Sequence, residues 1–182
     1  TGNTRRFGAS FEKIKQVVDV RKGEIMFGLN MIVHKGRTIF IGDTSVHEYP
    51  TSEQMAEIAI STARVVRLFG FDPKVAFVSH STFGQPLTSR TKHIRNAVEI
   101  LKEKNVDFQF DGDMQPDVAL NSEYEELYPF AKIVGKANIL IMPGQHSAAI
   151  SYKLMKTIGD TKVIGPLLIG LGLPIEIAPL RS

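Results

Sequence analysis

Apolar and polar residues fall along the chain in blocks that predict strands and helices in turn. Two apolar runs, 25–33 and 38–41, flank the polar turn 34–37, which predicts a β-hairpin with a four-residue loop. Three more apolar runs predict strands at 74–79, 106–110 and 139–142. The run 74–79 shows no clean alternation, which is typical of a strand buried on both faces.

Between the strands, apolar residues recur at helical spacing. The clearest helix follows Thr51, which is expected to form a capping box with Gln54, and it ends before Gly70, a residue suited to the left-handed position after a helix. Further helical segments are expected at 11–20, from Thr88 or Ser89 to 101, at 115–120, at 121–127 and after 144–147. The last of these carries an apolar side formed by Ile150, Leu154, Met155 and Ile158. The glycine-rich stretch 165–172 is expected to pack a tight helix with its turns.

The order of these elements, β-β-α-β-α-β-α-β-α, is typical of a doubly wound α/β fold. It predicts a three-layer sandwich around a mostly parallel, mixed sheet, because the first two strands are antiparallel neighbours. Residues 1–182 are expected to form one domain, in which 1–8 is a connector or a cut end.

Composition and charge narrow the class of protein. With 43% hydrophobic and 23% charged residues, the chain has the composition of a soluble globular protein. The net charge is +3 and the basic residues are scattered, so a nucleic-acid partner is not expected. The lack of cysteine excludes disulfides and cysteine-bound zinc. No apolar run approaches the ~18 residues of a membrane span, and no signal peptide is recognisable, so we expect a cytoplasmic protein without membrane contact.

Parallel strands end at the same edge of a sheet, so the loops after them are expected to converge there. These loops contain Asp43, 79–84, 111–113 and 144–147. The helix that opens after Gly144 presents free backbone amides, which suit an anion. Ser81, Thr82 and Ser147 fit hydrogen-bond donors to a phosphate better than nucleophiles, because no Gly-x-Ser-x-Gly elbow accompanies them.

The acidic and histidine residues of this edge leave alternatives open. Asp43, Asp111 and Asp113 are either paired carboxylates for acid–base chemistry or a metal, or acceptors for loop amides, which their positions favour. His80 and His146 are binding candidates, although the five histidines include no pair at metal-ligand spacing. The residues therefore favour an anion-binding edge over a site with a clear base or nucleophile.

Several stretches of the chain resemble the phosphotransacetylase family. They are 46–54 with 58–60, 81–84, 111–114 with 117–119, 135–141, and 164–170 with Pro174, and they span most of the chain in the family's order. Within the family, the chain is most similar to the phosphotransacetylase-like C-terminal domain of bacterial hybrid-type NADP-dependent malic enzymes. That closer resemblance rests on 46–48, Phe83, 143–147 and the ending 178–182.

The chain departs from active phosphotransacetylases at three places. Phe83 stands where they carry the lysine of a Ser-Thr-Lys-Gly motif. Residues 144–149 replace their Asn-Ala-Gly-Asn run, and 177–181 keeps Arg181 but lacks the serine of their Asp-Leu-Ser-Arg segment. An arginine at such an edge can still hold a phosphate through two hydrogen bonds.

The resemblance implies a domain that binds acetyl-CoA or a related phosphorylated ligand as an effector, without acetyl transfer. The ligand-binding residues are then Ser81, Thr82, Gly144, His146, Ser147 and Arg181, and the polar rim consists of Asp43, His80, Asp111 and Asp113. An active phosphate acetyltransferase is one alternative, and a domain that only dimerises its parent enzyme is another.

The same resemblance sets the expected partners and cofactors. The partners are a CoA ester, a malic-enzyme catalytic region in cis, and further copies in a homodimer or larger homo-oligomer. No cofactor is expected in the chain itself, which is expected to be a fragment. NADP and a divalent metal belong to the catalytic region of the parent enzyme, which this sequence does not contain.

Overall fold

The computed structural model describes residues 7–177. In chain order its elements are α1 (Phe7–Val17), β1 (Phe27–His34), β2 (Arg37–Gly42), α2 (Ser52–Leu68), β3 (Lys74–Val78), α3 (Ser89–Glu103), β4 (Gln109–Met114), α4 (Pro116–Leu120), the 3-10 helix η1 (Ser122–Leu127), β5 (Ile139–Ile141), α5 (Gln145–Ile158) and β6 (Thr161–Ile169). Within this range no helix is long and apolar enough to cross a membrane.

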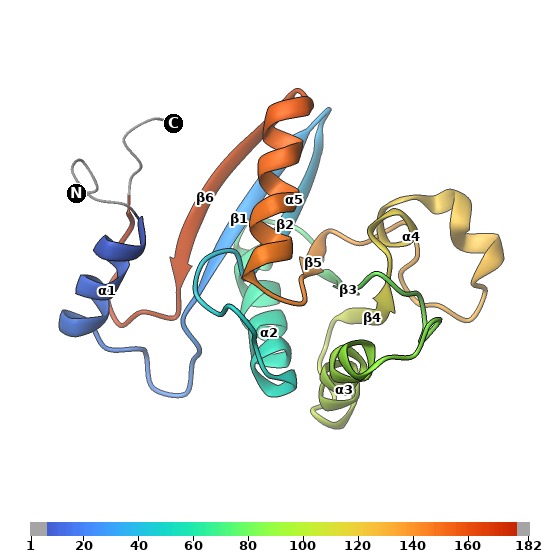
Figure 1. Ribbon diagram of the computed structural model, residues 1–182, viewed down its shortest axis with the longest axis horizontal. Coiled ribbons are helices and arrows are strands. Elements are labelled where there is room, and N and C mark those ends of the chain that lie inside the picture. Colours follow the sequence, from blue (N-terminus) through green and yellow to red (C-terminus); the bar gives the residue numbers. More distant parts are fainter. Residues whose placement is uncertain (1–6, 178–182) are drawn as a thin grey trace.

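The strands form one mixed sheet in the order β4-β3-β5-β2-β1-β6. The neighbours β4, β3, β5 and β2 are all parallel, while β1 pairs antiparallel with both β2 and β6. Figure 1 shows α1 at the β6 end of the sheet, and α3 and α4 at the β4 end. The predicted α/β class with a mostly parallel, mixed sheet is confirmed.

Helices cover both faces of the sheet, so the fold has three layers. Phe40 of β2 packs in one core cluster with the buried residues of α2 and α3. Its neighbours Ile39 and Ile41 point the other way, into a second cluster that contains residues of α4 and α5. Successive side chains of a strand alternate between the two faces of the sheet. Since both faces are covered here, β3 and β5 are apolar at nearly every position, which explains why 74–79 shows no alternation of apolar and polar residues.

The helix α2 forms as its sequence predicts. Thr51 and Gln54 make the expected capping box, in which the Thr51 hydroxyl accepts from the Gln54 amide and the Gln54 side chain accepts from the Thr51 amide. Met55, Ile58, Ala59 and Val66 are buried against the sheet. After the helix, Gly70 has a φ of 83°, which a glycine adopts without strain.

Two predicted boundaries are wrong. The hairpin turn has two residues, not four, because His34 and Arg37 pair with each other and both turn residues, Lys35 and Gly36, have positive φ. The strand expected at 106–110 is β4, and its pairing with β3 runs to Met114. Asp111 and Asp113 therefore lie within a strand and not in a loop after it.

The glycine-rich stretch 165–172 is not a helix, and that prediction is wrong. It contains most of β6, which pairs antiparallel with β1 from Thr161 to Ile169. Gly165 and Gly170 have φ values of 124° and 86°, and the carbonyl oxygen of Ile25 would lie 2.1 Å from a Cβ on Gly170. The glycines thus permit a close antiparallel approach of the chain.

Two helices present apolar residues differently from the expected pattern. Helix α1 spans Phe7–Val17 and not 11–20, and its last residue, Val17, is 80% exposed. On α5 the apolar residues Ile150, Leu154 and Ile158 are exposed, although Met155 is partly buried against the second core cluster. The described chain thus leaves Ile150, Leu154 and Ile158 of the apolar side of α5 uncovered.

Replacing Ile58 tests the packing of α2 on the sheet. Ile58 is 1% exposed, so Ile58→Ala is expected to lower the free energy of unfolding by about 2–5 kcal/mol through lost burial and a residual cavity. Leu68 on the same helix is 86% exposed, and Leu68→Ala is expected to change the free energy of unfolding by less than about 0.5 kcal/mol. Urea unfolding measures both, and equal effects would show that α2 is not seated on this face.

Candidate functional site

The four parallel strands bring their carboxyl ends to one edge of the sheet. Gly42, Ile141, Phe77 and Gly112 stand in one row across β2, β5, β3 and β4. The segments that follow this row therefore start side by side: Asp43 after β2, 142–147 after β5, 79–84 after β3, and Asp113 at the end of β4. The predicted convergence at one edge is confirmed for these segments but not for Asp111, which lies within β4 before this row.

The carboxylate of Asp43 organises the loop after β2. It is 4% exposed, and it accepts hydrogen bonds at 2.8–3.2 Å from the backbone amides of Gly28, Ser45, Val46 and His47. The His47 Nδ1 atom lies 2.8 Å from Asp43 Oδ2. A carboxylate has about four lone-pair sites, so Asp43 is fully engaged, and its interpretation as an acceptor for loop amides is confirmed.

A second buried carboxylate, Asp113, holds the loop after β3. Asp113 and Ser81 are both 0% exposed, and the Ser81 hydroxyl donates to Asp113 Oδ2. Asp113 Oδ1 accepts from the Gly84 amide at 3.0 Å, and the Asp113 carbonyl oxygen accepts from the Phe83 amide at 2.7 Å. Asp113 is thus also an acceptor for loop donors, placed to set the path of residues 81–84.

This loop keeps few donors for a ligand. The Thr82 and Gln85 amides bond to each other's carbonyl oxygens, and the Phe83 and Gly84 amides bond to Asp113. The Ser81 hydroxyl proton is also engaged by Asp113. The Thr82 hydroxyl accepts from the Gln115 amide at 3.2 Å and still has its own proton to donate, but Thr82 is only 7% exposed.

Asp111 binds a different segment, because it lies two residues before Asp113 in β4. Its Oδ1 accepts from the Gly112 amide at 2.9 Å and its Oδ2 from the Lys132 amide at 2.8 Å. It therefore attaches the segment 128–136 to β4. In residues 7–177 no group of three or more histidine or acidic side chains is placed to hold a metal ion.

The start of α5 forms the other part of the edge. Gly144 precedes the helix, and the Glu48 carbonyl oxygen would lie 2.5 Å from a Cβ there, so only glycine fits. That carbonyl accepts from the Gln145 amide at 3.3 Å, while the Ser147 hydroxyl donates to the Gly144 carbonyl at 3.0 Å. In the described chain no side chain caps α5, so the first-turn amides of His146 and Ser147 remain available to an anion.

The predicted site residues therefore fall into two groups at one edge. Ser81, Thr82 and Asp113 form the first group, and Gly144, His146 and Ser147 form the second, which Glu48 connects to the Asp43 loop. His146 is exposed, and its Nε2 lies 3.4 Å from Glu48 Oε1. His80 is exposed beside Ser81, and Arg181 lies outside the described residues.

Two tyrosines near the site have raised pKa values. The Asp117 carboxylate, by its charge and a hydrogen bond, raises the pKa of the Tyr124 phenol, with a smaller effect of Glu123. Burial raises the pKa of the Tyr152 phenol on α5. Both phenols are therefore neutral at pH 7, where they can donate a hydrogen bond but cannot serve as anionic bases.

An aromatic cluster beside the edge was missed from the sequence, apart from Phe83 itself. The rings of Phe83 and Phe130 have centroids 4.9 Å apart, those of Phe83 and Tyr128 5.5 Å, and those of Tyr128 and Phe130 6.2 Å. Phe83 and Tyr128 also pack against the second core cluster, whereas Phe130 is 69% exposed. Tyr128-Pro-Phe130 was the available signal, because it places two aromatic residues close together at the end of a polar segment.

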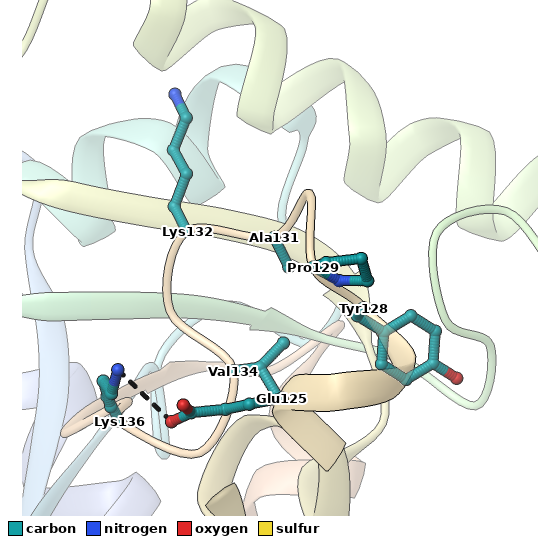
Figure 2. Close-up of a pocket in the computed structure, with 7 residues that line it drawn as sticks. All are labelled: Glu125, Tyr128, Pro129, Ala131, Lys132, Val134 and Lys136. Atoms are coloured by element: carbon teal, nitrogen blue, oxygen red, sulfur yellow. Dashed lines mark ion pairs between the residues drawn. The ribbon is translucent and has the colours of Figure 1, made fainter.

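A pocket of about 140 Å³ lies next to this cluster, along the segment 128–136. It is lined by Glu125, Tyr128, Pro129, Ala131, Lys132, Val134 and Lys136. Figure 2 shows Lys136 paired with Glu125, at 3.3 Å, while Lys132 projects to the opposite side of the segment. The charge of Lys136 is thus balanced within the pocket, and that of Lys132 is not.

Replacing Asp113 tests whether it sets the loop after β3. Asp113→Asn keeps the volume but replaces one carboxylate oxygen by an amide nitrogen, so the side chain can no longer accept from both the Ser81 hydroxyl and the Gly84 amide. The free energy of unfolding is expected to fall by about 1–3 kcal/mol, because a buried donor without an acceptor has lost its hydrogen bonds to water without replacement. Denaturant titration gives this value, and Asp107→Asn at an exposed carboxylate is the control. An unchanged stability of Asp113→Asn would contradict the assigned role.

Comparisons with known proteins agree with this architecture. The family model of phosphate acetyl/butaryl transferase matches residues 1–179. An NADP-dependent malic enzyme of Rhizobium meliloti (strain 1021) is 42% identical over 182 residues, which is 100% of this chain and 24% of that protein. The NADP-dependent malic enzyme of Escherichia coli (strain K12) is 34% identical and also covers 100% of this chain and 24% of its own length. The chain thus spans about a quarter of these relatives.

Proteins named as phosphotransacetylases are similar as well. A phosphate acetyltransferase of Clostridium acetobutylicum is 38% identical over 140 residues, 76% of this chain and 42% of that protein. The crystal structure of a phosphotransacetylase from Streptococcus pyogenes superposes with a TM-score of 0.88 at 29% identity, over 95% of this chain and 54% of that one. With a family model that matches nearly its whole length, the chain belongs to the phosphate acetyl/butaryl transferase family.

Proposed function

We propose that this chain is the phosphotransacetylase-like domain of an NADP-dependent malic enzyme, and that it binds acetyl-CoA as a regulatory effector without transferring the acetyl group. The observation that carries the proposal is the environment of Phe83. The resemblance described above implies that active phosphotransacetylases carry a lysine at this position. Here the side chain is apolar and packs between Tyr128 and Phe130, so the edge lacks that cation.

Hydrogen bonding at the edge supports binding without turnover. An acetyl transfer needs a group that activates the thiol or phosphate, and such a group must be free to exchange a proton. The Ser81 hydroxyl and the Asp113 carboxylate bond to each other in a fully buried position, and Asp43 accepts from the backbone of its own loop. These groups therefore support the structure of the edge and not proton transfer.

The start of α5 supports the binding of an anionic group. The uncapped first-turn amides and the positive end of the helix dipole favour a phosphate there. The exposed His146 stands on the same turn, and Arg181 is proposed to contribute from the far end of the chain. A CoA ester carries several phosphate groups, so one of them can take this position.

The parent enzyme supplies the rest of the proposal. We infer that a malic-enzyme catalytic region is joined to this domain in cis and that NADP and a divalent metal bind there. The malic-enzyme relatives, of which the chain spans about a quarter, support this arrangement. Acetyl-CoA bound at the edge would then change the rate of malate decarboxylation.

Titration with acetyl-CoA tests the effector role. Isothermal calorimetry on the intact protein is expected to show saturable heat, and malate decarboxylation is expected to change over the same concentrations. His146→Ala is expected to weaken binding several-fold, since it removes a side chain from the first turn of α5. Lys153→Ala, on a later turn of the same helix, serves as the control. A protein that gives no heat at millimolar acetyl-CoA does not have this function.

An active phosphate acetyltransferase is the second candidate. It is favoured by the phosphate acetyltransferase of Clostridium acetobutylicum, which is 38% identical over 140 residues. A coupled assay for acetyl-CoA formation from acetyl phosphate and CoA separates the two candidates. We expect no activity above the rate without protein, and a clear rate that His146→Ala lowers would establish the transferase instead.

We also propose that the chain associates with a second copy through α5. Ile150, Leu154 and Ile158 follow each other at a spacing of four and are 58%, 52% and 82% exposed. Ile164 of the adjacent strand β6 is 46% exposed, and β6 is the last strand on that side of the described sheet. Two copies related by a twofold axis can set this surface against itself and remove it from water.

Leu154→Glu tests this association. A carboxylate in an apolar interface is expected to dissociate the copies that meet through α5, which sedimentation velocity detects as a smaller species. Leu68→Glu places the same charge on the exposed side of α2 and is expected to leave the assembly unchanged. If Leu154→Glu and the unaltered protein sediment alike, the copies do not meet through α5.

A further inference from the structure

The aromatic cluster of Phe83, Tyr128 and Phe130 is more exposed than core packing requires. Phe83 and Tyr128 contribute to the second core cluster, but Phe130 is 69% exposed and Leu127 nearby is 66% exposed. The ring centroids are 4.9–6.2 Å apart, which is direct contact. No cation can therefore enter between the rings as in an aromatic cage, and the outer ring faces are the surface that remains for a ligand.

Two cations belong to segments that adjoin these rings. The Arg95 Nη1 atom of α3 lies 3.5 Å from the Phe83 carbonyl oxygen, and its guanidinium covers Gly84. Lys132 is two residues after Phe130, and Figure 2 shows it on the side of the segment opposite to the Glu125–Lys136 pair. Among the described residues neither cation forms an ion pair with a carboxylate; the Lys132 ammonium lies 5.6 Å from the Phe110 ring centroid. The exposed Phe130 ring thus belongs to a region with two positive charges that no described carboxylate pairs.

The positions of these residues are fixed by the edge of the sheet. The Phe83 amide donates to the Asp113 carbonyl oxygen, and the Lys132 amide donates to Asp111 Oδ2. Both anchors lie on β4, two residues apart, so the strand holds the two halves of the cluster in register. A ligand meets a preformed surface, which lowers the entropic cost of its binding.

From this geometry we propose that Phe83, Tyr128 and Phe130, with Arg95 and Lys132, form a binding site for an adenine nucleotide. The base stacks on the exposed ring of Phe130, and the phosphates pair with the guanidinium and the ammonium. Single-stranded nucleic acid fits less well, because it needs a groove with several stacking positions and a basic track, while the basic residues of this chain are scattered.

The nucleotide has two possible sources, and one of them rests on the proposed function. It is either the nucleotide end of the CoA ester, whose acyl end then reaches the edge beside Ser81 and Thr82, or a free nucleotide. The Phe83 amide connects the aromatic cluster to the edge through Asp113, so one extended ligand can occupy both. The chemistry at the cluster is the same in the two cases.

Calorimetry of the intact protein with ADP tests the site. ADP is expected to bind, and Phe130→Ala is expected to weaken it by about 5- to 150-fold, the range for loss of one base–aromatic stack. Leu127→Ala removes an equally exposed apolar side chain three residues away and is expected to change the Kd less than twofold. Thermal unfolding checks that both variants fold. Only the heat of ADP binding that is lost in Phe130→Ala is attributed to this site, because a dinucleotide site elsewhere in the intact protein can also bind ADP.

A second ligand and a second variant separate the contribution of the Phe130 ring to ADP binding from that of the positive charges. Pyrophosphate, which has no base, is expected to bind much more weakly than ADP, and its binding is expected to be unaffected by Phe130→Ala. Lys132→Gln is expected to weaken ADP several-fold and to reduce the salt dependence of its Kd. If ADP binds equally well to Phe130→Ala, or no better than pyrophosphate, the site does not exist.

Acetyl-CoA identifies the source and keeps the two proposals distinct. If Phe130→Ala weakens acetyl-CoA and ADP alike, the cluster binds the nucleotide end of the CoA ester. If it weakens ADP alone while acetyl-CoA still binds, the site exists and takes a free nucleotide. Phe130-dependent binding of ADP without any binding of acetyl-CoA would retain the site and reject the effector role. Binding of acetyl-CoA without Phe130-dependent binding of ADP would retain the effector role and reject the aromatic site.

Discussion

Two buried carboxylates at the ends of parallel strands determine the shape of the whole edge. Asp43 and Asp113 follow residues of one row in the sheet, and each is almost completely removed from water. A charge in such a position is tolerated only when hydrogen bonds surround it. The chain meets this condition by folding the loop after β2 around Asp43 and the loop after β3 around Asp113. The loops in turn position α2, the aromatic cluster and the start of α5.

This constraint supports the proposal that the edge holds a ligand without transforming it. A catalytic carboxylate or hydroxyl has to change its bonding during a reaction, whereas Asp43, Asp113 and Ser81 support the backbone around them. What remains for a ligand is the first turn of α5, the Thr82 hydroxyl and the aromatic surface at Phe130. These groups recognise charge and shape, and apart from His146 on that first turn none of them is a base of the usual kind.

Much of the fold could be predicted from the sequence because its strongest signals are local. The capping box at Thr51, the hairpin and the apolar strands of the central sheet depend on neighbouring residues, and all were found. The strand β6 was missed because only pairing with β1, more than a hundred residues earlier, makes a strand of its glycines. Of the site, Asp43, Ser81 and Asp113 could be placed from strand ends, but their bonding partners could not. Tyr128 and Phe130 meet Phe83 only after β4 has brought two distant segments together.

The close approach of Glu48 to Gly144 has a mechanical consequence. The Glu48 carbonyl oxygen lies against the glycine and accepts from the Gln145 amide, so the loop after β2 and the first turn of α5 are in direct main-chain contact. The same loop leads directly into Thr51 and the start of α2, on the opposite face of the sheet. The two helical layers are therefore connected through the plane of the sheet by a path made of main chain alone. Side-chain substitutions along the loop can tune this path but cannot easily remove it.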